Sequence, residues 1–200
     1  MPFEILNGAF VFFRRSLAIE RAEIFPCPFS HLCCGNTAEI CQKFTQTVLE
    51  AFKDFLAVNP DSPLNGADDA ALARVLAMKK GFRLFRDVEE SSRFLFVPDE
   101  QLEYQPDAVD KVLKKNDAQG LNVLRDLRPI LEGVIDWKAH DLEAAVNRYG
   151  EQKGLGLGKI AQPIRVAVSG GTVSPPIFES LEMLGRERTL ARIDRCVAAA

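Results

Sequence analysis

The sequence is poor in the residues that build most catalytic and metal-binding sites. Only two histidines, His31 and His140, occur in its 200 residues, and no serine or cysteine has an evident base to activate it. The pattern G-x-x-x-x-G-K-[ST] is missing too, which excludes a P-loop nucleotide site. No apolar run approaches the roughly 20 residues that a membrane-spanning helix needs. We therefore predict a soluble chain without catalytic residues of its own.

Cysteine is also scarce outside one region. Four of the five cysteines fall in residues 1–60, where they accompany one of the histidines. Zinc ligands usually come as two C-x2-4-C pairs, and the spacing here does not repeat in that way. We predict reduced thiols of a cytoplasmic protein and no metal site. The residues concerned are Cys27, His31, Cys33, Cys34 and Cys41.

Residues 1–60 lack clear periodicity until about Thr45. Their apolar patch near Phe10 has no positive residue before it, so it makes a weak secretory signal. We expect this head to be disordered, or to reflect a misassigned start or a truncated or frame-shifted gene. From about Gln46, the segment TVLEAFKDFL is typical of a helix that joins the head to the residues after it.

No segment alternates convincingly between apolar and polar residues, so we predict no strand. Helical spacing recurs instead, for example at Leu72, Val75 and Leu76 behind the acidic start at Asp68. The pattern predicts an all-α fold with two helical subdomains, at 61–137 and 138–200. The glycines at 154, 156 and 158 follow a helix and not a strand, so they indicate a helix stop and a turn and not a dinucleotide loop.

Charge is nearly balanced but unevenly distributed. The whole chain carries a formal charge of -3, made of -1 in residues 1–60, -4 in 61–137 and +2 in 138–200. A surface that faces phosphate groups is therefore expected toward the C-terminus.

The C-terminal third has the clearest helical pattern. Ile160, Ile164, Ala167 and Val168 share one face, which leaves Arg165 on the polar side with Lys159 and Gln162. After Gly170, the run Ser174-Pro175-Pro176 predicts a helix start with the serine side chain as cap. In the last helix Arg188, Arg192 and Arg195 share a face, which predicts a basic outer surface, although Glu187 and Asp194 beside them favour a structural role over phosphate binding.

Several of these runs together resemble a known family. They are SRFLF at 92–96, IDW at 135–137, EQKGLGLGKIAQPIRVAVSGG, TVSPPIFESLEMLG and RERTLARIDRC. In this order and spacing they are similar to the C-terminal anticodon-binding region of bacterial glutamyl-tRNA synthetases, over roughly 61–200. The resemblance implies a multihelical fold of the class I synthetase type, a cytoplasmic location, and a tRNA for glutamate as partner, with no role for DNA or a membrane.

The resemblance also implies which residues touch the anticodon. The family's contacts to the first two anticodon bases correspond to Arg165, Ser174, Pro175 and Ile177. From the residues alone, Arg165 also suits an exposed salt bridge, and Pro175 and Ile177 a helix start and a core anchor. Further candidate RNA contacts are Lys80, Arg83, Lys159, Arg188 and Arg192. Where glutamate-specific members have an arginine for the third base, this chain has Gly81, and Lys80 and Arg83 are near enough to replace it.

The catalytic half of the family's pattern is missing. This chain has neither the H-x-G-H motif nor the K-M-S-K-S loop with which these synthetases activate their amino acid. The resemblance therefore implies an anticodon-binding module that is not competent for aminoacylation alone. ATP and Mg²⁺ are cofactors of the complete enzymes, and a separate catalytic polypeptide is a candidate partner. The alternative is a helical protein-interaction domain that has kept the scaffold and lost RNA binding.

Overall fold

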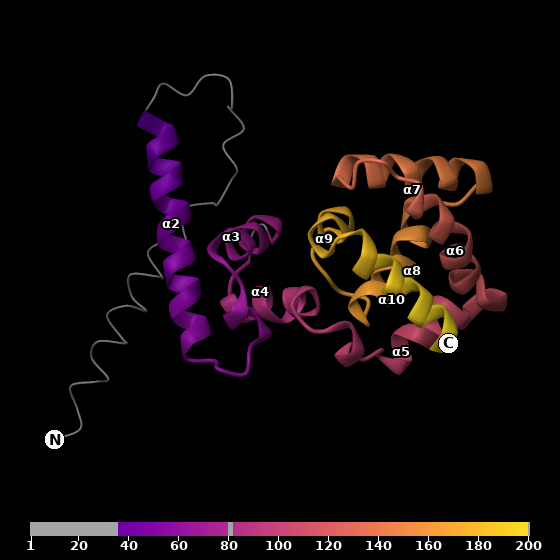
Figure 1. Cartoon of the computed structure of the whole chain (residues 1–200), viewed down its shortest axis with the longest axis horizontal. Helices are drawn as coiled ribbons and strands as arrows, with labels where there is room; N and C mark the ends of the chain where they lie inside the picture. Colours follow the sequence, from indigo (N-terminus) through magenta and orange to yellow (C-terminus); the bar gives the residue numbers. More distant parts are fainter. Residues whose placement is uncertain (1–35, 80–81, 200) are drawn as a thin grey trace. The chain divides into compact units, whose positions relative to one another are not determined.

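The computed structural model describes residues 36–79 and 82–199, with side chains from residue 45 onward. This part of the chain is helical and has no strand, which confirms the all-α prediction (Figure 1). The α-helices are α2 (Asn36–Ala57), α3 (Asp69–Met78), α4 (Phe85–Ser92), α5 (Pro106–Ala108), α6 (Lys115–Glu132), α7 (Ala139–Lys153), α8 (Leu157–Ser169), α9 (Ile177–Leu184) and α10 (Arg186–Ala199). Shorter turns are η1 (Pro63–Gly66), η2 (Arg93–Leu95), η3 (Asp99–Gln101) and the π-helix η4 (Val109–Lys114).

Local signals set several of the helix ends. The Asp68 carboxylate accepts the backbone N–H of Ala71 at 2.7 Å and so caps α3. Gly154 ends α7 with φ of 65°, and Gly185 follows α9 with φ of 87°, conformations that cost glycine least. The prediction of a helix stop at Gly154 is therefore confirmed, and α8 begins shortly after it.

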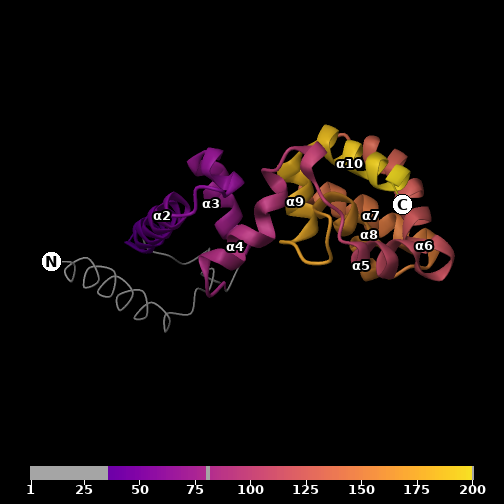
Figure 2. The ribbon, with the colours of Figure 1, turned by 90° about the horizontal axis from the view of Figure 1, so that it is seen from below.

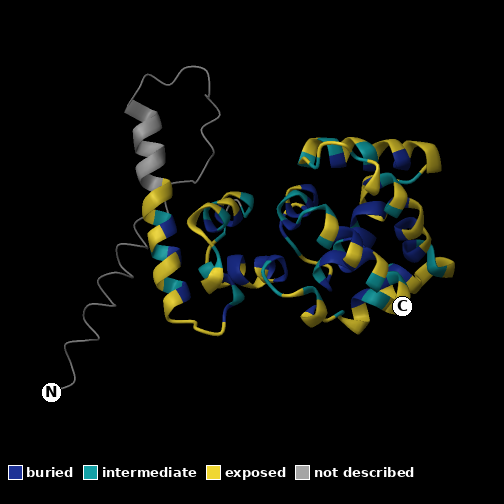
Figure 3. Cartoon of the chain, viewed as in Figure 1, coloured by how far each residue is buried: buried dark blue, intermediate teal, exposed yellow. Residues whose placement is uncertain are grey.

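The helix α8 lies at the centre of the C-terminal helices. It contacts α6, α7, α9 and α10, and the two views agree on this placement (Figures 1 and 2). Ile160, Ile164, Ala167 and Val168 are all fully buried, as their spacing predicted. Full burial of each large aliphatic side chain contributes roughly 1.5–3 kcal/mol. Figure 3 shows the buried residues gathered on the inward sides of these helices.

The N-terminal helices of the same unit have their own apolar contacts. Residues 47–200 form one compact unit. Phe52 of α2 is fully buried, and its ring centroid lies 5.3 Å from that of Phe85 at the start of α4. Leu72, Val75 and Leu76 of α3 are buried, again as predicted. The division into two subdomains at residue 137 stays a prediction.

Two further predictions concern membrane and metal sites. Within the described residues, no helix combines the length and apolarity that crossing a bilayer requires. Nor does this part of the chain bring three metal-ligating side chains together. Cys27, His31, Cys33 and Cys34 lie outside the described residues, as does the side chain of Cys41, so the prediction about them is not tested. Cys196 is a buried free thiol of α10.

Candidate nucleic-acid interface

A basic pocket of about 610 Å³ opens between α3 and the helices α8 and α9. Its lining includes three cationic side chains and one carboxylate, so an anion or a polar base edge fits it better than a cation does. The lining residues are Arg74, Ala77, Met78, Lys79, Arg165, Ser174, Pro175, Pro176 and Glu179. We call this the basic pocket.

Arg165 lies half-buried in the wall of this pocket. Its Nε donates a hydrogen bond to Ser174 Oγ at 2.9 Å, and Ser174 Oγ donates in turn to the Pro175 carbonyl at 2.9 Å. Within the described residues, no carboxylate comes within ion-pair distance of Arg165. Burial lowers the pKa of its guanidinium, which nevertheless stays charged because arginine starts above about 12. Arg165 therefore presents an oriented, uncompensated positive charge.

Ser174 does not cap the next helix, contrary to the prediction. The N-cap of α9 is Pro176, and no side chain accepts a hydrogen bond there. The serine hydroxyl is engaged by Arg165 instead, and a charged donor offers it a stronger partner than a backbone N–H. The loop before α9 thus helps to fix the position of Arg165 in the wall of the basic pocket.

The other candidates differ in how they relate to the pocket. Pro175 lines it, although most of its surface is buried. Ile177 is only 5% exposed and packs in the core, which fits the core-anchor interpretation. Lys159 and Arg83 are exposed but are not among the lining residues. Lys80 and Gly81 lie outside the described residues.

The sequence matches a known family over most of its length. A family model described as "Anticodon binding domain" matches residues 43–197. The chain belongs to this anticodon-binding domain family.

Relatives of the anticodon-binding domain agree with the resemblance seen in its sequence. It is 37% identical over 128 residues to "Glutamate--tRNA ligase 2" of Cereibacter sphaeroides, covering 64% of this chain and 26% of that protein. It is 37% identical over 131 residues to "Glutamate--tRNA ligase 2" of Brucella ovis, covering 63% and 26%. The chain thus spans about a quarter of the length of these relatives.

Solved structures show the same fold. A glutamate tRNA ligase from Elizabethkingia meningosepticum superposes with a TM-score of 0.63 at 22% identity, over 77% of this chain and 29% of that one. The glutamate-tRNA synthetase of Elizabethkingia anophelis gives a TM-score of 0.61, also at 22% identity, over 77% and 28%.

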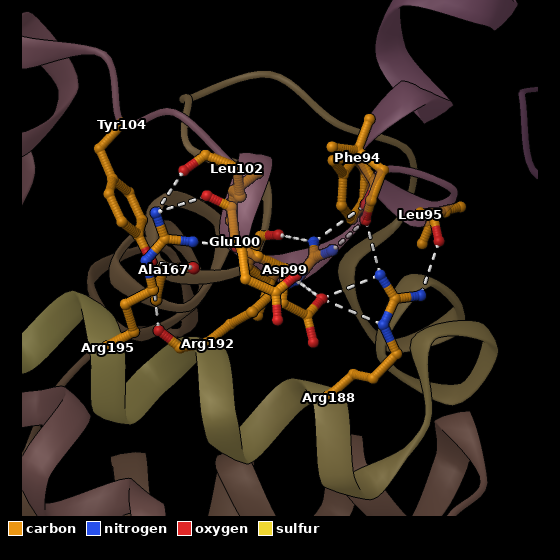
Figure 4. A network of polar contacts seen from close by, with 12 residues as sticks. Phe94, Leu95, Asp99, Glu100, Leu102, Tyr104, Ala167, Arg188, Arg192 and Arg195 are labelled. Carbon is orange, nitrogen blue, oxygen red and sulfur yellow. Dashed lines mark hydrogen bonds and ion pairs between the residues drawn. The ribbon is translucent and has the colours of Figure 1, made fainter. Parts of the chain in front are cut away.

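The arginines of α10 require a correction. Arg192 is completely buried in this anticodon-binding domain, and its Nε donates to Asp99 Oδ1 at 2.7 Å (Figure 4). Its Nη1 donates to the carbonyls of Phe94 at 2.9 Å and Val168 at 2.6 Å. Arg188 also binds Asp99 Oδ1, with Nη2 at 2.9 Å. The predicted basic outer surface on this helix is wrong, because these side chains turn toward residues 94–102.

Arg195 completes this group, which we call the α10 arginine cluster (Arg188, Arg192 and Arg195). It donates to backbone carbonyls of Asp99, Glu100 and Leu102, and its guanidinium lies over the ring of Tyr104. Burial would raise the pKa of Asp99, but the hydrogen bonds from Arg188 and Arg192 hold it below its usual range. Arg192 is fully buried and therefore not available as an RNA contact. The side chain of Arg188 is 37% exposed, so RNA contact by Arg188 stays a prediction.

Sequence reasoning missed two cations of the basic pocket. Arg74 and Lys79 both come from α3 or its C-cap, and the pocket forms only because α3 lies opposite α8 and α9. Arg74 and Met78 are one helical turn apart, which placed them on a common face. That spacing could have predicted that Arg74 and Met78 share one surface of α3, but not that α8 and α9 lie opposite this surface.

Proposed function

We propose that this chain binds the unpaired anticodon loop of a tRNA for glutamate in the basic pocket. The observation that carries the proposal is Arg165, a half-buried guanidinium with a serine partner and, among the described residues, no carboxylate within ion-pair distance. Leaving such a charge unpaired is costly unless a ligand compensates it. An unpaired RNA loop supplies both phosphates and base edges with acceptor atoms.

The shape of the pocket supports the same proposal. Bases of an unpaired loop are splayed out and lie against apolar surface while their edges accept or donate hydrogen bonds. Met78 and Pro176 provide apolar surface, and Lys79 and Arg165 provide charge, within one pocket of about 610 Å³. We propose specificity for glutamate tRNA because the relatives are glutamate–tRNA ligases. We also infer that catalysis depends on residues outside this chain, since its own sequence lacks the activation motifs.

The test is a titration of the whole chain with a transcribed tRNA for glutamate at several salt concentrations. Neutralising about four phosphates of a single strand gives a log–log slope of affinity on salt of about -3. A transcript with the same body and a different anticodon is the control, and it should bind more weakly. A flat, non-saturating response to both RNAs would contradict the proposal and favour the protein-interaction alternative.

A further inference from the structure

Glu182 of α9 ties three separate segments together beside the basic pocket. Its Oε1 pairs with Arg74 Nη2 of α3 at 2.6 Å and with Lys138 Nζ at 3.4 Å. Its Oε2 accepts the backbone N–H of Ala139 at 2.7 Å, at the start of α7. That backbone hydrogen bond lowers the pKa of Glu182 most, and Arg74 and Lys138 lower it further. Glu182 is therefore ionised at neutral pH and fixed at both oxygens.

Arg74 pairs with Glu182 and also lines the basic pocket. Its side chain is 44% exposed, whereas that of Glu182 is 17% exposed. Within the described part of the chain, the Glu182 carboxylate is the only group that pairs with the Arg74 guanidinium. A guanidinium has several N–H donors in one plane, so donors remain for a ligand.

Arg74 differs from Arg165 in its surroundings. A carboxylate that is shared with Lys138 lies 2.6 Å from Arg74 and offsets part of its positive charge, whereas Arg165 has no carboxylate within ion-pair distance among the described residues. A partly offset guanidinium attracts a phosphate less, but the carboxylate holds its planar donors in a fixed orientation. Such a fork suits two neighbouring acceptors on a base edge, where lysine cannot replace arginine.

We propose that Arg74 is a specificity-determining residue of the basic pocket, which donates to the acceptor edge of one unpaired base, and that Glu182 positions it. The inference rests on the proposed function, because it assigns a role within the same RNA-binding pocket. Arg165 and Lys79 then supply the uncompensated charge, and Arg74 supplies base discrimination.

A pair of substitutions on α9 separates positioning from plain electrostatics. Glu182→Gln and Glu179→Gln each remove one negative charge from the same helix, and Glu179 also lines the pocket. If charge alone mattered, both variants would bind RNA more tightly. With Glu182 as a positioning residue, Glu182→Gln weakens binding while Glu179→Gln strengthens it. Glutamine at 182 can still accept the Ala139 N–H, so the start of α7 keeps its partner.

The experiment measures the affinity of the full chain for an anticodon stem-loop RNA and for single-base variants of its loop, each at several salt concentrations. We expect Arg74→Lys to weaken binding of the matched loop by about 5- to 150-fold, as loss of a bidentate base contact does. The preference for the matched base at one loop position should disappear, while the salt slope stays as in the unchanged chain. Retention of full base preference by Arg74→Lys would overturn the inference.

A double-variant cycle tests whether Glu182 acts through Arg74. In an Arg74→Ala background, Glu182→Gln should no longer weaken binding. If it weakens binding as much as before, Glu182 acts on the fold and its positioning role is overturned; the unfolding midpoint of each variant is recorded alongside. Failure of the unchanged chain to bind the stem-loop refutes the proposed function itself. If Arg165→Ala weakens binding but the Arg74→Lys variant still prefers the matched base, this inference alone is refuted and the proposed function stands.

Discussion

Arg165 of α8 and Arg192 of α10 come from helices in direct contact, yet their side chains have opposite surroundings. Arg192 is fully buried and donates four hydrogen bonds, to Asp99 and to the carbonyls of Phe94, Val97 and Val168. Arg165 is half-buried and has a single neutral partner, Ser174. Arginine content and helical spacing do not distinguish the two residues.

The two guanidinium groups differ in how many hydrogen-bond donors and how much charge remain free for a ligand. The α10 arginine cluster donates hydrogen bonds to residues 94–102 and to the Val168 carbonyl of the same chain, and so stabilises the fold. The basic pocket keeps donors and charge for a ligand, so it is suited to binding. The partners of an arginine in this domain thus indicate whether it stabilises the fold or is free to bind a ligand. Substitutions in the α10 arginine cluster and in the basic pocket test this distinction.

The largest effect is expected from Arg192→Ala. Removing this side chain leaves the carbonyls of Phe94 and Val168 without their donor and deprives Asp99 of one of its two arginines. Breaking such a buried pair costs about 3–5 kcal/mol, which denaturant unfolding will measure. Arg148→Ala, at an exposed site on α7, is the matched control and should change stability little. A loss for Arg192→Ala no larger than that of the control would contradict a structural role for the cluster.

Arg165→Ala should weaken RNA binding and leave stability almost unchanged. We expect RNA affinity to fall by roughly 1–3 kcal/mol, as for a lost base-edge contact, while the denaturant midpoint moves little. Arg125→Ala, which removes a charge from the exposed side of α6, is the control and should leave RNA binding unchanged. Equal affinities of the Arg165 variant and the unchanged chain would remove this residue from the interface.

Ser174→Ala should weaken RNA binding less than Arg165→Ala does. The lost hydrogen bond is worth about 0.5–1.5 kcal/mol, and its effect arises only because Arg165 becomes free to move. The double variant Arg165→Ala/Ser174→Ala should therefore bind no worse than Arg165→Ala alone. Additive losses would show that Ser174 contacts the RNA directly.

The smallest effect is expected on acid stability. Because arginine hydrogen bonds hold the pKa of Asp99 below its unfolded value, its contribution is present above about pH 4. It is lost as the pH falls through the lower, folded-state pKa. Denaturant midpoints measured between neutral and acidic pH should thus fall less steeply for Asp99→Asn than for the unchanged chain. Parallel slopes would show that Asp99 does not titrate in this way.

Much of the fold could be predicted because its signals are local. The Asp68 cap, the stop at Gly154 and the apolar face of α8 each depend on residues within a few turns of one another. Arg165 and Ser174 were each named as anticodon contacts from runs that resemble the family, and they lie together in the basic pocket, but the hydrogen bond between them was not predicted. These parts of the structure need no knowledge of distant partners.

The residues that sequence reasoning misassigned or missed depend on tertiary contacts. Arg192 binds Phe94 from 98 residues away, so helical spacing alone could not reveal that its side chain turns inward. Arg74 depends on Glu182 in the same way. Ser174 was assigned as a cap because it precedes two prolines, and its engagement by Arg165 shows that a tertiary donor outcompetes the local one.

The long separation between α10 and residues 94–102 has a consequence for synthesis on the ribosome. The carbonyls of Phe94, Leu95 and Val97 are made well before the arginines that bind them, 98 residues earlier in the case of Phe94 and Arg192. At translation rates of about 5–20 residues per second, this delay lasts about 5 to 20 s. These carbonyls have no arginine partner until α10 has been made, so the domain completes its folding only after α10 emerges.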